Sequence, residues 1–391
     1  MMKPSLSPAR RALLAACAIG LSAPAAFAQD AVRVGLILEM SGPFADFGKQ
    51  METGIKVYQK QFGETVAGKR IEVIIKDVGG PNPELAKRLA QELVVRDKVQ
   101  ILGGFGFTPN ALSVAPIATQ AKIPMVVMNA AATGLTAKSP YMVRTSFSYD
   151  DIVPPMAQWA VKNGFKKAYV LVADYAPGHD AEAAFIAAYK QAGGEIVGTV
   201  RTPVVTLDFS PYMQRVKDAK PDVLFAFVNG GDVAPAFFKE YREKELEQAG
   251  IKLIGTGDIV DESAIDVVGD RALDTVTVFP YSLNHKSDVN TRYVQDYKTQ
   301  RDAKVRPSLM SVSAYDGMAA IYAALKKTNG NTDGQALIEA FKGVRLDSPR
   351  GAISIDPTSR DIVQNKYIRR VTRVDNVLGN TEFETFKPAA R

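Results

Sequence analysis

The stretch Val99–Asn110, VQILGGFGFTPN, joins an apolar run to a glycine-rich turn and then to a candidate helix start. Strand, turn and helix in this order form the building unit of parallel α/β sheets. The strand end and the helix N-terminus together supply free backbone N–H groups and positive potential, which suit an anion. Gly104 and Gly106 allow close backbone approach, Thr108 adds a hydroxyl donor, and Phe107 adds an apolar wall.

The anion at this turn is better matched by a carboxylate than by a nucleotide phosphate. The stretch lacks the third glycine of a dinucleotide fingerprint, and it follows the third predicted strand, whereas the fingerprint belongs to a first strand. A second turn of small residues, MNAAATGLT at 128–136, follows the next strand. Turns on adjacent parallel strands meet at the carboxyl edge of the sheet, so the two predict one carboxylate pocket.

Predicted strands and helices alternate outward from this stretch in two successive runs. Asn82 is placed to cap a helix whose first residue is Pro83. This pattern predicts an α/β protein with two doubly wound parallel-sheet lobes. The strands are expected at 32–38, 71–75, 99–102, 124–128, 141–145, 168–172, 196–200, 223–228, 253–254 and 276–280, and the helices at 46–61, 83–94, 111–121, 150–163, 179–191, 209–219, 233–248, 288–303, 311–327 and 334–341.

The tail from Ser348 to Asn376 departs from this pattern because its apolar residues alternate at period two. Turn residues at 356–357 and 375–376 make it hairpin material. Since the tail builds no lobe of its own, it must complete the first two lobes. We therefore expect the chain to cross between the lobes more than once.

The first 28 residues are typical of a signal peptide. Positive charges at Lys3, Arg10 and Arg11 precede an apolar stretch at 12–21, and small residues at 26–28 mark a cleavage site. Arg10 and Arg11 leave general secretion and twin-arginine export open. Residues 14–17 also fit a lipoprotein cleavage box, although it would leave only residues 12–16 as an apolar region. We expect a periplasmic protein that begins near Gln29.

The remaining composition is that of an ordinary globular protein. Cys17 is the only cysteine, so a chain cleaved after Ala28 has no disulfide and relies on its core. The net charge of +6 falls to a mild +3 without the leader. Short basic clusters such as Arg369, Arg370 and Arg373 lie on an alternating strand pattern, and we expect no nucleic-acid partner.

Motifs of catalysis and metal binding are missing from the sequence. There is no G-x-S-x-G, H-E-x-x-H or G-x-x-x-x-G-K-[ST]. The two histidines, His179 and His285, have no ligand spacing, and the Asp261–Glu262 pair is typical of a helix start. We therefore expect neither a metal site, a cofactor nor a catalytic residue.

With these features, the chain resembles the type I periplasmic solute-binding proteins of ABC importers, and within them the leucine/isoleucine/valine-binding group. The resemblance spans the whole mature chain. Its strongest marks are VRVGLILEMSGPFADFGKQMETGIKV at 32–57 and APIATQAKIPMVVMNAAATGLT at 115–136. Weaker marks are KPDVLFAFVNGGD at 220–232, GTGD at 255–258 and SVSAYDGM at 311–318.

The resemblance implies two lobes that close over a small molecule. They would comprise residues 29–146 with about 282–347, and residues 147–281 with about 348–391, joined by crossovers near 144–148, 280–283 and 346–351. It also implies a monomer that delivers its cargo to permease subunits. The implied ligand-binding residues are Phe47, Phe107, Thr108, Asn129, Ala130, Ala131, Thr133 and Tyr315 in the first lobe, and Tyr175, His179, Asn229, Gly230 and Asp258 in the second.

The sequence departs from the leucine-binding pattern at several of these positions. The position that carries a hydroxyl group beside the ligand carboxylate in leucine binders is occupied here by Ala131, or by Thr133 after a shift. The position of the acid that would meet an ammonium group is occupied by Gly257, or by Asp258 after a shift of one. An amino acid needs such an acid because a desolvated, unpaired charge costs several kcal/mol. Aliphatic or other amino acids and aromatic or keto acids therefore stay open as cargo. A ligand-sensing receptor of the same fold, or an exported α/β enzyme, is the alternative function.

Overall fold

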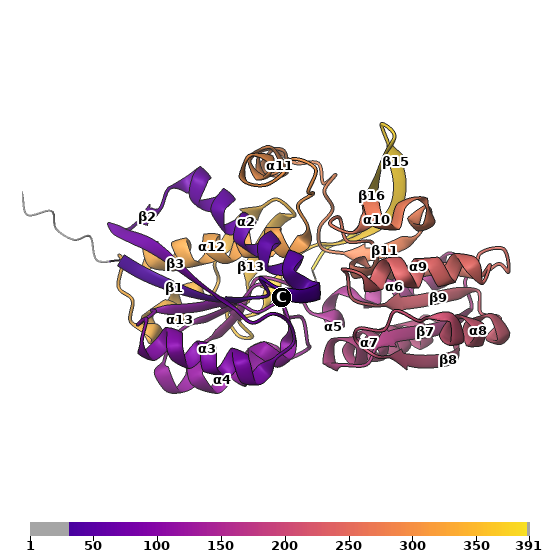
Figure 1. Ribbon diagram of the computed structural model, residues 1–391, viewed down its shortest axis with the longest axis horizontal. Coiled ribbons are helices and arrows are strands. Elements are labelled where there is room, and N and C mark those ends of the chain that lie inside the picture. Colours follow the sequence, from indigo (N-terminus) through magenta and orange to yellow (C-terminus); the bar gives the residue numbers. More distant parts are fainter. Residues whose placement is uncertain (1–30, 389–391) are drawn as a thin grey trace, which may run out of the picture.

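The computed structural model describes residues 31–388, so the predicted signal peptide and lipoprotein box lie outside the described residues. Two lobes lie side by side, and each has a mainly parallel sheet between helices (Figure 1). The predicted α/β class with two wound lobes is therefore confirmed.

The sheet of the first lobe has six strands in the order β2-β3-β1-β4-β5-β6. All pairs are parallel except the β2–β3 hairpin. Because β1 is buried on both faces, its residues alternate between two core clusters, with Ile37 on one side and Leu36 and Leu38 on the other. The strands are β1 (Ala31–Leu38), β2 (Thr65–Val66), β3 (Lys69–Asp77), β4 (Ile101–Gly104), β5 (Met125–Val127) and β6 (Met142–Arg144).

Helices α3 and α4 cover one face of this sheet, and α2 and α12 cover the other (Figure 1). The predicted cap of α3 is confirmed, since Asn82 Oδ1 accepts from the Leu85 N–H at 3.1 Å. The helices of this lobe are α2 (Ala45–Phe62), α3 (Pro83–Val95), α4 (Thr108–Ala121), α11 (Asp288–Gln300), α12 (Leu309–Lys327) and α13 (Gly334–Phe341), with short 3-10 turns η1 (Gly42–Phe44) and η2 (Leu135–Lys138).

The sheet of the second lobe has seven strands in the order β16-β15-β11-β10-β9-β7-β8. The strands up to β11 pair in parallel, and the long β15–β16 hairpin joins β11 antiparallel. They are β7 (Lys167–Ala173), β8 (Glu195–Thr202), β9 (Val223–Phe227), β10 (Lys252–Thr256), β11 (Val276–Phe279), β15 (Lys366–Val374) and β16 (Val377–Phe386).

The helices of the second lobe differ from the predicted ones at several ends. The helix expected at 150–163 is divided at Val153, which keeps helical backbone angles, because Pro154 and Pro155 have no N–H group to donate to the preceding turn. The next helix begins at Ala176, not His179, since Pro177 is accommodated in its first turn. The helices are α5 (Tyr149–Ile152), α6 (Pro154–Lys162), α7 (Ala176–Gln191), α8 (Ser210–Ala219), α9 (Val233–Glu243) and α10 (Ile265–Val268), with η3 (Gly257–Val260) and η4 (Gly269–Ala272).

The tail forms hairpins, as its alternation predicts, but it divides between two sheets. Strands β12 (Arg345–Ser348), β13 (Gly351–Ile355) and β14 (Ile362–Val363) form a small antiparallel sheet of their own, and β12 packs on α12. The resemblance placed the third crossover at 346–351, whereas the chain enters the sheet of the second lobe only after β14. The lobe boundaries given above stay a prediction.

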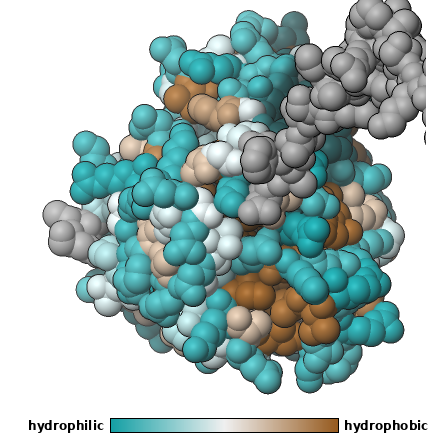
Figure 2. Space-filling view, turned by 90° about the vertical axis from the view of Figure 1, so that its left-hand side faces the viewer, coloured by the Kyte–Doolittle hydropathy of each residue, from teal (hydrophilic) through white to brown (hydrophobic). Residues whose placement is uncertain are grey.

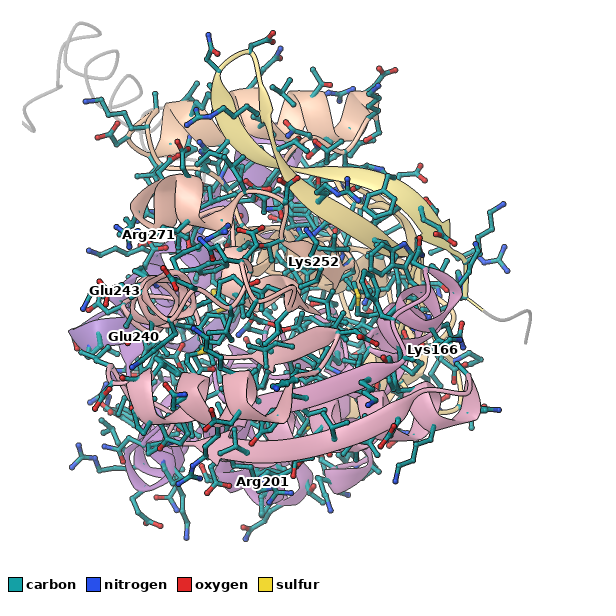
Figure 3. All side chains as sticks on the ribbon, turned by 90° about the vertical axis from the view of Figure 1, so that its right-hand side faces the viewer. Lys166, Arg201, Glu240, Glu243, Lys252 and Arg271 are labelled. Carbon is teal, nitrogen blue, oxygen red and sulfur yellow. The ribbon has the colours of Figure 1, made fainter. Side chains whose placement is uncertain are left out.

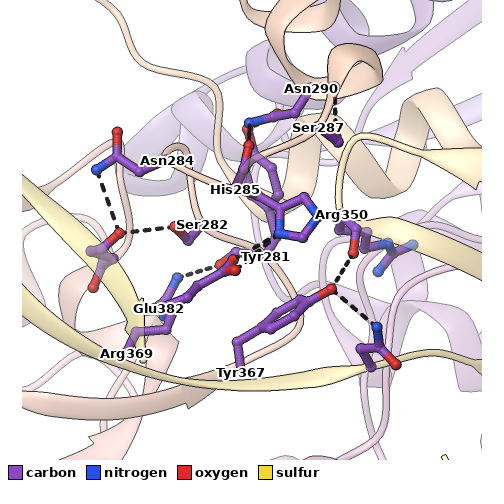
Figure 4. A network of polar contacts seen from close by, with 12 residues as sticks. Tyr281, Ser282, Asn284, His285, Ser287, Asn290, Arg350, Tyr367, Arg369 and Glu382 are labelled. Carbon is purple, nitrogen blue, oxygen red and sulfur yellow. Dashed lines mark hydrogen bonds and ion pairs between the residues drawn. The ribbon is translucent and has the colours of Figure 1, made fainter. Parts of the chain in front are cut away.

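A polar network surrounds the crossover that follows β11 (Figure 4). His285 Nδ1 lies 3.0 Å from Glu382 Oε2, and its ring packs against Tyr367. The Tyr367 hydroxyl donates to the Arg350 carbonyl at 2.8 Å, and the Arg369 guanidinium donates to the Tyr281 carbonyl. This network accounts for His285, which has no part in the pocket described below.

The outer ends of the lobes are mostly hydrophilic. Figure 2 shows a larger hydrophobic patch and smaller hydrophobic areas among hydrophilic atoms at the end of the first lobe. The end of the second lobe carries exposed charged side chains of both signs, including Lys166, Arg201, Glu243, Lys252 and Arg271 (Figure 3). Within residues 31–388, no helix combines the length and apolar character needed to cross a bilayer.

A fully buried ion pair joins α12 to the segment between β12 and β13. Arg350 Nη2 and Nε lie 2.7 and 3.0 Å from Asp316 Oδ2, and the Ser348 hydroxyl donates to the same oxygen at 2.8 Å. The guanidinium also donates to the carbonyl groups of Thr145 and Ser146, which lie just beyond β6. The pair therefore ties the start of one crossover to the long helix.

We expect Asp316→Ala to lower the free energy of unfolding by about 3–5 kcal/mol, because the Arg350 charge would stay buried without its partner. Ser348→Ala, which removes one hydrogen bond to the same carboxylate, should cost about 1 kcal/mol. Urea denaturation followed by circular dichroism measures both. Equal and small losses in the two variants would contradict this assignment.

Candidate functional site

A pocket lies between the two lobes, at the carboxyl ends of their strands, and its empty space is about 540 Å³ including the part open to solvent. Both turns singled out in the sequence contribute to it, and so do loops of the second lobe. The lining residues are Phe47, Gly106, Phe107, Thr108, Asn129, Ala130, Ala131, Phe147, Tyr149, Tyr175, Pro177, Asn229, Gly230, Asp258, Asp261, Ser263 and Met310.

The first turn links β4 to the N-terminus of α4. Phe107 is the N-cap residue and Thr108 is the first helical residue, with Pro109 in the first turn. The first N–H groups of a helix have no acceptor within the helix, and the helix dipole adds positive potential there. Since Phe107 and Thr108 line the pocket, this end of it is suited to an anionic oxygen.

The second turn, after β5, is tied directly to the first. The Asn129 side-chain amide donates to the Gly106 carbonyl at 2.8 Å, and the Ala130 N–H donates to the Phe105 carbonyl at 2.9 Å. Thr108 Oγ1 accepts from the Ala132 N–H at 3.4 Å. The two turns therefore lie together, as their positions on neighbouring strands predict.

Aromatic rings form much of the pocket wall in both lobes. In the first lobe Phe47 and Phe107 are stacked, with ring centroids 5.7 Å apart and an interplanar angle of 19°. In the second lobe Tyr175 stacks on Phe227, and Tyr149 packs against the same ring. Such surfaces favour a flat apolar ligand.

The polar groups of the second lobe are hydroxyl groups and acids. The Tyr175 hydroxyl donates to Asn229 Oδ1 at 2.7 Å, and the Tyr149 hydroxyl donates to Asp258 Oδ2 at 3.2 Å. Burial raises the pKa of Asp258 to about 6 and that of Asp261 to about 7. Hydrogen bonds from Tyr149 to Asp258, and from Ser263 to Asp261, act in the opposite direction.

Three residues in the predicted set do not line the pocket. Thr133 lies at its rim, where the Thr133 N–H donates to Asp180 Oδ2 of the second lobe at 2.8 Å. His179 Nε2 is paired with Asp174 Oδ1 at 2.7 Å, because the earlier start of α7 moves this side chain off the cleft. Tyr315 is buried against Tyr58 and Tyr293, so it belongs to the packing between α2, α11 and α12.

The other predicted residues lie at the pocket, and several further lining residues were missed. Phe147 and Tyr149 follow β6 in the first crossover, and their place just after a parallel strand was the signal that could have found them. Asp261 was interpreted only as part of a helix start. Met310, at the start of α12, lies 161 residues or more beyond these aromatics in the sequence, and no sequence pattern indicated it.

No cluster of three or more His, Cys, Asp or Glu side chains suited to a metal ion occurs within residues 31–388.

Comparison with known proteins places this geometry in a family. Residues 31–376 match the family model described as a periplasmic binding protein. The Leu/Ile/Val-binding protein homolog 6 of Brucella melitensis is 44% identical over 377 residues, which is 96% of each chain.

Two solved structures of similar proteins contain aromatic acids. A solute-binding protein of an ABC transporter from Rhodopseudomonas palustris BisB5, in complex with 3,4-dihydroxybenzoic acid, is 49% identical with a TM-score of 0.88. Another from R. palustris, in complex with 4-hydroxybenzoate, is 42% identical with a TM-score of 0.89. Each alignment covers 92% of this chain and 98% of the other. With its two wound lobes and the pocket between them, this chain belongs to the periplasmic binding protein family, as a type I solute-binding protein of an ABC transporter.

Proposed function

We propose that this chain captures a benzoate with a ring hydroxyl group in the periplasm and delivers it, chemically unchanged, to the permease subunits of an ABC importer. One observation carries the proposal. A single pocket combines a turn suited to a carboxylate, a set of aromatic rings, and a partly buried acid that already accepts a hydroxyl group. A hydroxybenzoate has a matching group for each of these three features.

The carboxylate of the ligand would lie at the two tied turns of the first lobe. The N–H groups at the start of α4 and the Thr108 hydroxyl are the donors for it, and the small side chains of Ala130 and Ala131 leave room beside the backbone. An N-terminal helix end stabilises an anion without a basic side chain.

The ring and its hydroxyl group would meet the aromatic walls and the second lobe. Phe47 and Phe107 present stacked faces, and the Tyr149–Asp258 pair offers an acceptor for a phenolic O–H. The two solved proteins described above, which hold hydroxylated benzoic acids, support this class of ligand.

An aliphatic amino acid is the second candidate. Asp258 and Asp261 both line the pocket and could balance an ammonium group, and the similar Brucella protein has the name of a Leu/Ile/Val-binding homologue. Against it, Asp258 already accepts a hydrogen bond from the Tyr149 hydroxyl.

Hinge closure is the mechanism we propose for capture. A ligand that bridges both lobes stabilises the closed arrangement in which Thr133 and Asp180 are bonded across the cleft. We further propose export through cleavage near Ala28, a monomeric state and the absence of catalytic turnover.

A ligand screen tests the cargo. We expect 4-hydroxybenzoate and 3,4-dihydroxybenzoate, at a hundredfold excess over Kd, to raise the melting temperature by about 3 to 4 °C. Leucine, isoleucine and valine should not raise it. A shift with the amino acids alone would replace the proposed cargo with the second candidate, and product formation from any of these acids would contradict a binding role.

Asp258→Ala tests the hydroxyl contact. We expect affinity for 4-hydroxybenzoate to fall about 10- to 100-fold, because the phenolic O–H loses a carboxylate acceptor. Affinity for benzoate, which has no ring hydroxyl group, should change by less than about threefold. Isothermal titration calorimetry measures both ligands. Equal losses for the two would show that Asp258 does not contact the hydroxyl group.

Asp180→Ala tests closure. The variant loses the cross-cleft bond to the Thr133 N–H without touching the ligand, so affinity should fall about threefold, the scale of an exposed charge-assisted bond. Asp174→Ala is the matched control, since it removes an equal charge six residues earlier and breaks only the pair with His179. Calorimetry should show an unchanged Kd for this control. Equal effects in both variants would indicate a general charge effect.

A further inference from the structure

Glu39 is a fully buried acid directly behind the pocket wall of the first lobe. It follows the last residue of β1, and its carbonyl accepts from the Gly48 N–H on α2 at 3.2 Å. That bond lies beside Phe47, which lines the pocket. The backbone of Glu39 therefore supports the Phe47 side of the pocket, and its side chain reaches the turn at Gly106.

The Glu39 carboxyl group lies against the β4–α4 turn, and Glu39 is not among the residues that line the pocket. A Cβ atom added to Gly106 would be 2.1 Å from Glu39 Oε2, so only glycine leaves space for the acid here. Glu39 Oε1 accepts from Asn110 Nδ2 at 3.3 Å, and Asn110 belongs to the first turn of α4. The acid thus supports the same turn that we propose for the ligand carboxylate.

The charged surroundings of Glu39 disfavour a second negative charge. The side-chain partner from α4 is the neutral amide of Asn110, and α2 contributes only a backbone N–H. At the end of β3, the negative charge of Asp77 raises the pKa of the Glu39 carboxyl group. Desolvation raises the pKa of Asp77, but hydrogen bonds from Ser41 and from the N–H groups of Met40 and Gly79 lower it more. Asp77 therefore stays ionised.

These surroundings agree with the titration of Glu39 itself. Burial raises the pKa of Glu39 to about 8, and Asp77 adds to the shift, while hydrogen bonds from the backbone of Glu39 itself, from the Asn110 side chain and from the backbone of Gly106 act in the opposite direction. At neutral pH the carboxyl group is therefore mostly uncharged.

We propose that Glu39 is a positioning residue that must carry its proton for the β4–α4 turn to hold an anion. This inference rests on the proposed function, because it needs a carboxylate ligand in that turn. An ionised Glu39 and an ionised ligand would face each other across one backbone segment with little water between them, and their repulsion would be strong. Binding of a carboxylate is then linked to retention of one proton.

The linkage predicts how affinity changes with pH. A bound anion raises the pKa of Glu39 further, so binding weakens as pH rises through the value of the free protein. For benzoate, whose own charge is constant in this range, we expect about tenfold weaker binding at pH 9 than at pH 7. Glu39→Gln keeps the shape and removes the titration, so its affinity should be nearly constant over the same interval.

Calorimetry from pH 6.5 to 9 with benzoate tests this, with Glu84→Gln as the matched control. Glu84 is an exposed acid on α3 of the same lobe, and its variant should keep the pH dependence of the wild type. Titration of Asp258 and Asp261 affects all three proteins alike, so only the difference between them reports on Glu39. An equal slope in Glu39→Gln and the wild type overturns the proposal.

Proton uptake in the wild type gives a second measurement that does not depend on any variant folding. Titrations at pH 8 in buffers with different ionisation enthalpies should show uptake of a fraction of a proton when benzoate binds. If no proton is taken up, or if protons are released, the role of Glu39 is overturned while the proposed cargo stays intact. If the wild type binds neither benzoate nor 4-hydroxybenzoate at any pH, the proposed function fails first and this inference falls with it.

Discussion

Backbone N–H groups at the start of α4 must find an acceptor, and that requirement shapes the first lobe around the pocket. Thr108 begins the helix at the carboxyl end of β4, so these donors point at the cleft. The neighbouring turn is held against them by the bonds from Asn129 to Gly106 and from Ala130 to Phe105. In the proposed function these two strand ends hold the ligand carboxylate without a lysine or arginine, and the sheet keeps them in place.

In the proposed function, the second lobe provides the selectivity for the rest of the ligand. Its contribution comes from a crossover and from strand ends: Tyr149 after β6, Tyr175 after β7 and Asp258 after β10. Two hydroxyl groups, an amide and two acids form a polar region enclosed by rings. Because the polypeptide chain connects the lobes only through crossovers, a ligand that spans both regions can hold the lobes together.

Two acids near this pocket have different surroundings, because Glu39 is fully buried and Asp258 is only partly buried. Asp258 has a hydroxyl donor and lies at the pocket surface, whereas Glu39 lies behind a glycine with an amide as its side-chain donor. Burial raises the pKa of both carboxyl groups, but only the ligand-facing one can exchange its partner for a ligand. The acid behind the wall can act only through the turn that it supports.

The sequence alone determined the layers, because apolar runs of strand length alternating with helical periodicity leave few arrangements other than a wound α/β sheet. It also located both turns, since glycines and small residues mark the strand ends. Tertiary structure alone decided the details that depend on distant segments. Tyr315 packs inward because α2 and α11 cover it, His179 turns to Asp174, and the tail divides between two sheets. Which face of a helix meets the cleft is a property of the packed neighbours, and no local pattern records it.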